Sequence, residues 1–486
     1  MYLGIDVGTS SVKAVVADES QAVVAQASAP LTVSRPRPLW SEQDAESWWK
    51  ATVEAIGALP AEVRRAVKAV GLSGQMHGAT LLDEADRPLR PAILWNDGRS
   101  GVECAELEAA EPQSRAITGN LVMPGFTAPK LLWVRKHEPE IFRRTASVLL
   151  PKDYVRLKLT GEKVSDMSDA SGTSWLDVGR RDWSDAMLGA TGLSRKQMPR
   201  LVEGSETSGT LLREVASELG LASVPVAGGG GDNAASAVGL GVVASGQAFL
   251  SLGTSGVLFV ANDRFCPNAE KAAHAFCHCL PNRWHQMAVL LSAASALDWV
   301  VELTGGKSID ASLLAAEQKG LRRSSPFFLP YLSGERTPHN DPNCRGVFFG
   351  MTADTDAADL VLAVLEGVAL AFVDGQEVLL EAGSSIGDIS VTGGGSRSIF
   401  WGRILAAALN RPLSYRQGSE VGAAFGAARL ARMAATGEAA ASICALPQLV
   451  RTVEPETDLA ALIEERRPIF TNLYRNLKST FKELSQ

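Results

Sequence analysis

Two stretches of sequence decide the fold, GIDVGTSSVKAVVAD at residues 4–18 and FLSLGTSGVLFVAND at residues 249–263. Each holds an apolar segment, the tripeptide Gly-Thr-Ser and a second apolar segment that ends near an aspartate. Apolar runs on either side of a short turn that contains glycine predict a β-hairpin. Because the pattern occurs once near the start of the chain and once past its middle, we expect a duplicated protein whose halves follow one plan.

A second pair of segments repeats in the same order. VKAVGLSGQMHG at residues 67–78 and GDISVTGGGSRS at residues 387–398 each place a β-branched apolar strand before glycines and small polar residues. Strands that alternate with helical patterns across two related halves predict an α/β protein of two mixed-sheet domains. The small residues at 239–246 mark the expected boundary, which gives an N-terminal domain at 1–244 and a C-terminal domain at 245–486.

Three other segments are expected to form helices. Apolar residues recur at three- and four-residue spacing from 360 to 372, which predicts a long helix interrupted at Gly367. The apolar stretch 287–303 predicts a buried helix that is too short to cross a bilayer. Residues 456–486 predict a closing amphipathic helix, bent or broken at Pro468, that could pack on either domain.

Composition and charge favour a small-molecule partner. The chain has 486 residues, of which 46% are apolar and 21% charged, and these values exclude a disordered, collagen-like or coiled-coil protein. The formal net charge is −7, and no long run of lysine or arginine supplies the basic surface that nucleic acid or an anionic membrane requires. We therefore expect neither nucleic acid nor membrane as a partner.

The cysteines indicate reduced thiols and a cytoplasmic protein. The chain has 6 cysteines, and they form no Cys-x-x-Cys pair. Cys277, His278 and Cys279 offer three ligands at most, without the second pair that a structural zinc site needs. The chain runs from Met1 directly into an apolar strand with Asp6 in it, a pattern unlike a signal peptide.

Two other glycine patterns resemble nucleotide-binding motifs but lack part of each. Residues 304–308 end like a phosphate-binding P-loop, yet the first glycine of that motif is replaced by Val301. A helix C-terminus followed by a turn is expected there instead. Gly229, Gly231 and Ala234 match G-x-G-x-x-A, but the acid expected about 20 residues later for a dinucleotide is missing.

The repeated turns themselves are candidates for phosphate binding. A Gly-Thr-Ser turn leaves backbone N–H groups and hydroxyls accessible, and two such turns that face each other could hold the phosphates of a nucleotide from both sides. Asp6 precedes the first turn, whereas Ser251 stands at the matching place before the second. Because Mg²⁺ keeps most of its water and takes one or two carboxylates, Asp6 is the candidate metal ligand. Each turn alone could be an ordinary hairpin turn.

Asp232 is the second carboxylate of interest. It follows the predicted strand at 224–229 in the segment GGGGDNAA at residues 228–235. Four glycines allow a ligand to approach the backbone closely, and the start of a helix favours an anion. A structural helix cap would also explain this aspartate, but a cap rarely needs four glycines.

These motifs together resemble the FGGY family of carbohydrate kinases along nearly the whole chain. GIDVGTSSVK is similar to the phosphate loop of the family, and GFTAPKLLWVRKH at residues 125–137 fits its first signature, with Lys130 and Trp133 in place. GVFFGM followed by DLVLAVLE, within residues 346–366, fits the second signature. GGGSRS at residues 393–398 resembles the loop on the adenosine side. The resemblance implies an actin-like, ribonuclease H-like fold with the active site in the cleft between the domains.

The segments expected to face the substrate resemble most closely those of family members that act on D-xylulose. They are PLWSEQD at residues 38–44, GLSGQMHGATLLD at 71–83, RPAILWNDGRS at 90–100 and YLSGERTPHN at 331–340. Family members that act on glycerol carry an Arg-Glu pair where this chain has Met76 and His77. The resemblance therefore implies a wider sugar site, ATP with Mg²⁺ as the phosphate donor and D-xylulose 5-phosphate as the product.

The resemblance also assigns roles to individual residues. Asp232 is expected to be the general base, Asp6 the metal ligand, and Met76, His77 and Asn233 the sugar contacts. The nucleotide contacts are expected at Gly8, Thr9, Ser10, Gly253, Thr254, Trp299, Gly394 and Gly395. Members of the family are often dimers, so a homodimer is allowed, and sugar binding is expected to close the two domains.

Two alternatives share these motifs. One is a kinase of the same family that acts on another ketose or polyol, such as L-ribulose or glycerol. The other is an actin-type or chaperone-type switch that uses ATP to change shape. A dependence of ADP release on added sugar separates a kinase from a switch.

Overall fold

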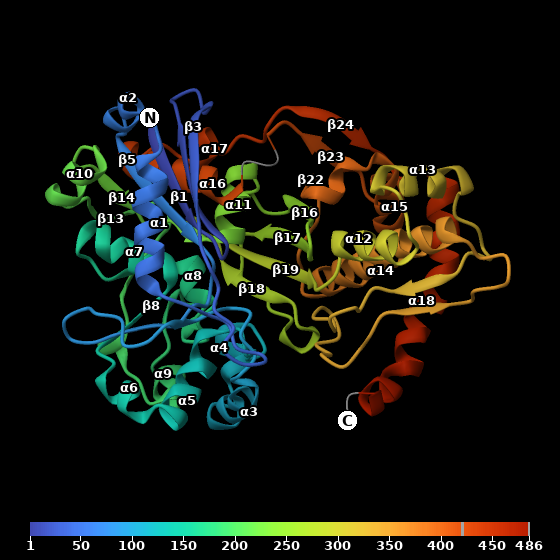
Figure 1. The fold of residues 1–486 in the computed structure, drawn as a ribbon, viewed down its shortest axis with the longest axis horizontal. Helices are drawn as coiled ribbons and strands as arrows, with labels where there is room; N and C mark the ends of the chain where they lie inside the picture. Colours follow the sequence, from blue (N-terminus) through green and yellow to red (C-terminus); the bar gives the residue numbers. More distant parts are fainter. Residues whose placement is uncertain (419–421, 485–486) are drawn as a thin grey trace.

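The protein is described by a computed structural model that covers residues 1–418 and 422–484. Two seven-stranded mixed sheets lie side by side with helices on their faces, as Figure 1 shows. The predicted fold class, an α/β protein with two mixed sheets, is confirmed. The two predicted Gly-Thr-Ser hairpins are confirmed as well, because each pairs two antiparallel strands.

The two sheets have the same plan of strands. In the first sheet the order is β13-β14-β5-β1-β2-β3, with β15 also paired to β5, and in the second it is β18-β19-β17-β16-β22-β23-β24. The hairpin β1–β2 corresponds to β16–β17, and each hairpin has a parallel neighbour, β5 or β22, on its first strand. The second predicted pair of repeated segments thus forms these two parallel neighbours. The strands of the first sheet are β1 (Tyr2–Val7), β2 (Ser11–Ala17), β3 (Val23–Pro30), β5 (Ala69–Gly74), β13 (Thr207–Thr210), β14 (Pro225–Ala227) and β15 (Gly230–Gly231). Those of the second are β16 (Ala248–Leu252), β17 (Gly256–Asn262), β18 (His274–Cys277), β19 (Trp284–Leu290), β22 (Ile389–Thr392), β23 (Leu413–Arg416) and β24 (Leu449–Val453).

Five small two-stranded sheets accompany the large ones. Their strands are β4 (Glu42–Gln43) with β7 (Ala92–Ile93), β6 (Thr80–Leu82) with β8 (Ser147–Leu149), β9 (Val164–Asp166) with β12 (Arg200–Val202), β10 (Leu176–Asp177) with β11 (Asp182–Trp183), and β20 (Phe327–Leu329) with β21 (Val347–Phe349).

Helices connect the strands along the chain and cover the faces of the sheets. In the first half they are α1 (Ala45–Gly57), α2 (Ala61–Arg65), α3 (Gly101–Ala110), α4 (Ser114–Thr118), α5 (Thr127–His137), α6 (Pro139–Arg144), α7 (Pro151–Thr160), α8 (Met167–Ser171), α9 (Asp185–Thr191), α10 (Arg213–Leu219) and α11 (Asp232–Leu240). In the second half they are α12 (Ala294–Leu303), α13 (Ile309–Lys319), α14 (Ala357–Glu381), α15 (Ile399–Leu409), α16 (Gly422–Thr436), α17 (Ala440–Ile443) and α18 (Thr457–Leu484), together with the short 3₁₀ segments η1 (Arg195–Gln197), η2 (Ala269–Lys271) and η3 (Gly394–Arg397).

One helix of the second half packs on the first sheet. Helix α16 contacts β1, β5 and α11, and in Figure 1 its orange-red ribbon lies among the blue strands. A Cβ atom on Gly4 or Gly71 would lie 1.8 or 1.9 Å from a backbone oxygen of α16. Glycine is therefore required at these two positions of β1 and β5, because the helix backbone rests directly on the strands.

Three of the predicted helices differ from the structure in detail. Helix α14 runs without a break through Gly367, where a Cβ atom would lie 2.2 Å from the carbonyl oxygen of Phe328. The predicted interruption is wrong, since this glycine allows a close contact. The stretch 287–303 is not one helix, because it contains the end of β19 and then α12. The closing helix α18 is continuous through Pro468 and contacts α14, α15 and β20 of the second half.

Other sequence expectations agree with the structure. Helix α12 ends at Leu303, and Gly305 adopts a positive φ of 66° before the next helix, so residues 304–308 form the predicted helix end and turn. All six cysteines are free. Within residues 1–418 and 422–484, none of the helices has the length and apolar character required to span a bilayer.

Candidate active site

The first Gly-Thr-Ser turn joins β1 to β2 and is held by side chains from other segments. The Thr9 hydroxyl donates to Oε1 of Gln75 at 3.1 Å and accepts from Nε1 of Trp95 at 3.0 Å. Nε2 of Gln43 donates to the Thr9 carbonyl at 2.7 Å, and Nε2 of Gln75 donates to the Gly8 carbonyl at 3.2 Å. The position of this turn is therefore fixed by buried glutamines that the sequence analysis did not single out.

The amide of Gly8 does not face outward as expected. Its N–H donates to the carbonyl of Ser11 at 3.0 Å, a bond that closes the turn. This corrects the expectation that the Gly8 amide is available to a phosphate. The neighbouring Ser10 is exposed, and its carbonyl accepts from the N–H of Leu31 at 2.8 Å.

The second turn, at Gly253 and Thr254, is tied to the start of α12 through its carbonyl groups. The N–H groups of Ala294 and Ala293 donate to the carbonyls of Gly253 and Thr254, at 2.8 and 3.0 Å. The Ser295 hydroxyl also donates to the Thr254 carbonyl at 2.7 Å. These bonds use the carbonyl side of the turn and leave its amides available for an anion.

The two carboxylates come from strand ends that share β5 as a neighbour. Asp6 on β1 lies opposite Ser73 on β5, and Gly230 on β15 pairs in parallel with the same Ser73 from the other side. Asp232 begins α11 directly after β15. Because β1, β5 and β15 run parallel, their carboxyl ends meet at one edge of the sheet, which is where α/β proteins bind ligands.

The electrostatics of this edge disfavour two isolated charges. Burial and the nearby charge of Asp232 raise the pKa of Asp6 to about 6. Burial also raises the pKa of Asp232, an effect that the hydrogen bonds from Asn233 oppose. Oδ1 of Asp6 is buried and has no hydrogen-bond partner within the described part of the chain. A buried unpaired carboxylate oxygen beside a second carboxylate fits a hard divalent cation such as Mg²⁺.

Asn233 acts on Asp232 directly. Its backbone N–H and its Nδ2 donate to Oδ1 of Asp232 at 2.7 and 3.0 Å. Among residues 1–418 and 422–484, both hydrogen bonds to this carboxylate end on Oδ1. The other oxygen, Oδ2, receives neither of these two bonds.

His77 has a backbone conformation that few residues other than glycine adopt. Its φ is 68°, and its carbonyl accepts hydrogen bonds from Nζ of Lys130 at 2.8 Å and from the Thr127 hydroxyl at 3.2 Å. Since left-handed backbone in a bulky residue is strained, such outliers are typical of functional sites. Lys130, which the sequence analysis assigned only to a family signature, thus helps to fix the histidine.

The His77 ring is neutral and has a defined tautomer. Nδ1 lies 2.6 Å from the carbonyl oxygen of Gly172, and because a carbonyl only accepts, Nδ1 carries the proton. Burial and the positive charge of Lys130 lower the pKa of His77 to about 3. Its ring stacks on Phe126 with centroids 4.7 Å apart. Nε2 is therefore an acceptor that can receive a sugar hydroxyl.

Met76 contacts the glycine segment that leads to Asp232. A Cβ atom on Gly231 would lie 2.9 Å from Sδ of Met76, and one on Gly230 would lie 2.3 Å from Sγ of Cys279. Gly229 has a positive φ of 79°. The groups that approach this segment closely belong to the protein itself, and close approach by a ligand stays a prediction.

A charged residue of the second half also lies near His77. Nη1 of Arg336, within the predicted substrate segment 331–340, is 3.3 Å from Nε2 of His274. The positive charge of Arg336 contributes to the lowered pKa of His77. The structure thus brings part of this segment into electrostatic range of the predicted sugar contact.

The predicted adenosine contacts occupy two places. Gly394 and Gly395 begin η3 after β22, and a Cβ atom on Gly394 would meet nothing within 4 Å. The Trp299 ring lies parallel to Phe328 and Phe348, at centroid distances of 5.7 and 6.1 Å. Trp299 therefore packs in an aromatic cluster of the second half, and its contact with adenosine stays a prediction.

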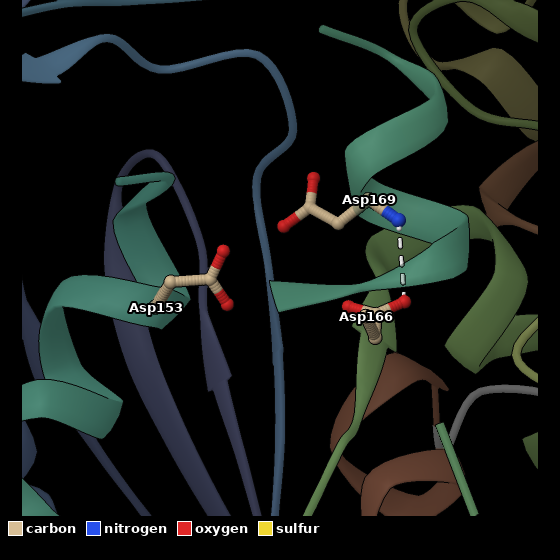
Figure 2. A group of neighbouring side chains, drawn as sticks. All are labelled: Asp153, Asp166 and Asp169. Carbon is tan, nitrogen blue, oxygen red and sulfur yellow. Dashed lines mark hydrogen bonds between the residues drawn. The ribbon is translucent and has the colours of Figure 1, made fainter. Parts of the chain in front are cut away.

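A buried acidic cluster behind the site was not predicted. Asp153, Asp166 and Asp169 converge in Figure 2, and within the described ranges they are the one group of such side chains that could share a cation. Nζ of Lys152 already lies 2.6, 2.8 and 2.9 Å from one oxygen of each carboxylate. Burial raises the pKa of Asp169 well above its ordinary value. The ammonium group fills the position of a metal ion, so this cluster is an ionic network. The segment from Cys277 to Cys279 is buried, and it belongs to no such group among the residues that the structure describes.

Comparison with known proteins gives one consistent result. Residues 1–239 match the N-terminal domain, and residues 248–435 the C-terminal domain, of the FGGY family of carbohydrate kinases. The chain is 56% identical to the xylulose kinase of Escherichia coli K12 over 480 residues, which cover 98% of this chain and 99% of the relative. It is 52% identical to the xylulose kinase of Klebsiella pneumoniae with the same coverage.

Solved structures agree with this comparison. The crystal structure of "a xyloylose kinase from Brucella ovis" has a TM-score of 0.95 and 54% identity, with 99% of each chain covered. The Plasmodium falciparum glycerol kinase with ADP, at 20% identity and a TM-score of 0.88, covers 99% of this chain and 97% of its own and shares the fold.

Proposed function

The chain belongs to the FGGY family of carbohydrate kinases, and we propose that it transfers the γ-phosphoryl group of ATP to the terminal hydroxyl of D-xylulose. The products are D-xylulose 5-phosphate and ADP. The observation that carries the proposal is the similarity, along nearly the full chain, to relatives named xylulose kinase. Met76, which together with His77 distinguishes the predicted sugar site from that of glycerol kinases, lies against Gly231, the residue before Asp232, and supports the proposal.

Asp232 is the proposed general base. The hydroxyl oxygen of the sugar forms a bond to the γ-phosphorus, the bond from that phosphorus to the β,γ-bridging oxygen breaks, and the hydroxyl proton passes to Oδ2 of Asp232. Burial raises the pKa of Asp232 and so makes its carboxylate a stronger proton acceptor. Because a loose transition state needs little deprotonation before bond formation, the position of the carboxylate matters more than its basicity.

The sugar is oriented by groups next to this base. Nε2 of His77 accepts a hydrogen bond from one sugar hydroxyl, since Nδ1 is bound to Gly172. Met76, which packs against Gly231, supplies an apolar surface beside the sugar. Asn233 acts through Asp232, since both of its donors are bound to Oδ1. A neutral histidine suits an uncharged sugar because it binds without the desolvation of an ion.

Asp6 is the proposed ligand of Mg²⁺, through the buried Oδ1 that lacks a partner among the described residues. A cation bound there would neutralise charge on the β- and γ-phosphate oxygens. The amides of Thr9, Ser10, Gly253 and Thr254 are proposed to bind phosphate oxygens, while Gly8 supports the first turn through its bond to Ser11. Gly394 and Gly395 are proposed to lie beside the adenosine.

A coupled assay of ADP release tests the proposal. MgATP is supplied without sugar and then with D-xylulose, L-ribulose, D-ribulose, L-fuculose, gluconate or glycerol. Selective turnover with D-xylulose and low ATPase activity without sugar are expected. Turnover with another member of the panel would replace the substrate, and release that does not depend on sugar would contradict the kinase assignment.

Three features of the proposed enzyme stay predictions. They are a boundary between two domains near residue 244 with closure on sugar binding, a cytoplasmic location and a homodimer. Small-angle scattering with and without ligands, cell fractionation and sedimentation test them in turn.

A further inference from the structure

Helix α8 lies between two parts of the proposed active site. Near its start, the Ser168 hydroxyl accepts a hydrogen bond of 3.0 Å from the N–H of Gly231, the residue before Asp232. Just beyond its end, the Gly172 carbonyl accepts a hydrogen bond of 2.6 Å from Nδ1 of His77. One short helix therefore contacts the segment that carries the proposed base and the side chain proposed to orient the sugar.

The orientation of the Ser168 hydroxyl follows from its partners, which are the N–H of Gly231, Oδ1 of Asp166 and, at 3.6 Å, Sγ of Cys279, whose thiol can donate to the same oxygen. The N–H of Gly231 can only donate, so the hydroxyl oxygen accepts there. The hydroxyl proton is donated to Oδ1 of Asp166, because a carboxylate accepts. Rotation of the hydroxyl would break a buried hydrogen bond, which is unfavourable when no water replaces it.

Asp166 is itself immobilised. Its Oδ1 accepts from the N–H groups of Ser168 and Asp169 at 2.9 and 3.2 Å and thereby caps α8. Its Oδ2 lies 2.8 Å from Nζ of Lys152, which also contacts Asp153 and Asp169. The side chains of these four charged residues have 0% exposure. Lys152, Asp166, Ser168 and Gly231 thus form a series of contacts between buried residues.

The same cluster holds the other end of the glycine segment. Arg156, 3.9 Å from Asp153, donates to the carbonyl of Ala227 at 2.6 Å and to the carbonyl of Gly228. Glycines have no side chains with which to anchor themselves, so hydrogen bonds to their backbone determine where the segment lies. Ser168 accepts the hydrogen bond from Gly231, the residue that precedes Asp232.

We propose that Ser168 is a positioning residue that places the Asp232 carboxylate through the amide of Gly231, with Asp166 and Lys152 as its support. The inference rests on the proposed function, in which Asp232 is the base. A displacement of about 1 Å at a reacting group can reduce turnover about 100-fold. The hydroxyl of Ser168 therefore contributes to kcat although it touches no substrate.

The test compares Ser168 with a buried serine whose hydroxyl makes no hydrogen bond within the described part of the chain. Ser165 on β9 is buried like Ser168, but its hydroxyl has no hydrogen-bond partner within the described part of the chain. Ser168→Ala is expected to lower kcat with D-xylulose about 10- to 100-fold while KM for ATP changes less than threefold. Ser165→Ala is expected to keep wild-type values. Equal kinetics of the two variants would overturn the inference and leave the proposed function intact, since the wild-type enzyme tests that function separately.

A second comparison separates positioning from general damage to the fold. In an Asp232→Asn background, the added Ser168→Ala substitution is expected to cause little further loss of kcat, because the group that it positions is already gone. A further 10-fold loss in that background would overturn the inference. If Ser168→Ala does not fold, as judged by circular dichroism, Ser168→Cys fills the same space with a weak hydrogen-bonding group and is expected to show the same dependence on Asp232. If Ser168→Cys lowered kcat equally in the wild-type and Asp232→Asn backgrounds, the inference would likewise be overturned.

Discussion

Asp232 raises the pKa of Asp6, although β5 lies between the two strands from which these carboxylates come. The protein thus keeps two acidic groups close enough to repel each other at the edge of its first sheet. Repulsion of this kind lowers the stability of the folded state, and a bound cation relieves it. We therefore expect the two carboxylates to lower the stability of the metal-free protein and to favour the binding of a cation.

Asp6→Asn should make the metal-free protein more stable at pH 7.5. The native pKa of Asp6 is about 6, above the ordinary value of 3.8, so between these values the native state binds more protons than the unfolded state and stability falls as pH rises. The variant lacks this loss, which is at most about 3 kcal/mol. Its melting temperature in EDTA should exceed that of the wild type at pH 7.5, and the difference should shrink towards pH 4. An equal difference in melting temperature between the two proteins at pH 7.5 and at pH 4 would contradict the raised pKa of Asp6.

Added Mg²⁺ should stabilise the wild type more than Asp6→Asn. A cation that binds only the native state stabilises it by RT ln(1 + [Mg²⁺]/Kd), so the melting temperature rises with the Mg²⁺ concentration. We expect this rise in the wild type and little or none in Asp6→Asn. An equal rise in both proteins would exclude Asp6 as the metal ligand.

Asp232→Asn should lower kcat with D-xylulose by about 10² to 10⁴, the usual contribution of a positioned acid or base. The amide cannot accept the hydroxyl proton as the carboxylate does. Asp185→Asn is the matched control, because Asp185 also begins a helix, α9, but is exposed. Near-normal turnover of Asp232→Asn in the coupled assay would reject the proposed base.

His77→Asn should raise KM for D-xylulose about tenfold with a smaller change in kcat, because it removes one neutral hydrogen bond to the sugar. Asparagine tolerates the positive φ better than most residues, so the backbone should be kept. Since the pKa of His77 is about 3, its protonation should add no pH dependence to KM between pH 5.5 and 8. The exposed His137 provides a control, and His137→Asn should match the wild type.

Gln75→Leu should raise KM for ATP about tenfold, because it removes the side chain that bonds both Thr9 and the Gly8 carbonyl in the first turn. KM for D-xylulose should change much less. Gln376→Leu removes another buried glutamine, on α14 in the second half, and should leave KM for ATP unchanged. Equal effects in both variants would show that Gln75 has no specific role at the turn.

The sequence predicted those features that depend on short segments. The two hairpins follow from adjacent apolar runs around Gly-Thr-Ser, and Asp6 and Asp232 stand beside recognisable glycine patterns. Gly367 was misjudged because its effect on α14 depends on Phe328, which is distant in the chain. No local pattern marks this contact.

The ionic cluster is a second feature that local sequence patterns do not reveal. Lys152, Asp153, Asp166 and Asp169 lie on α7, β9 and α8 and resemble ordinary surface charges in the sequence. Their burial arises only when the three segments pack together. Ser168 is therefore visible as a contact of Gly231 only in three dimensions.

The position of α16 has a consequence for synthesis of the protein. The ribosome completes the strands of the first sheet by about residue 231, yet the helix that rests on Gly4 and Gly71 ends at Thr436. At 5 to 20 residues per second, the covered face of β1 and β5 stays open for roughly 10 to 40 s during translation. A nascent chain of this protein therefore carries an exposed apolar sheet face through almost half of its production, and this is the period in which a chaperone would recognise it.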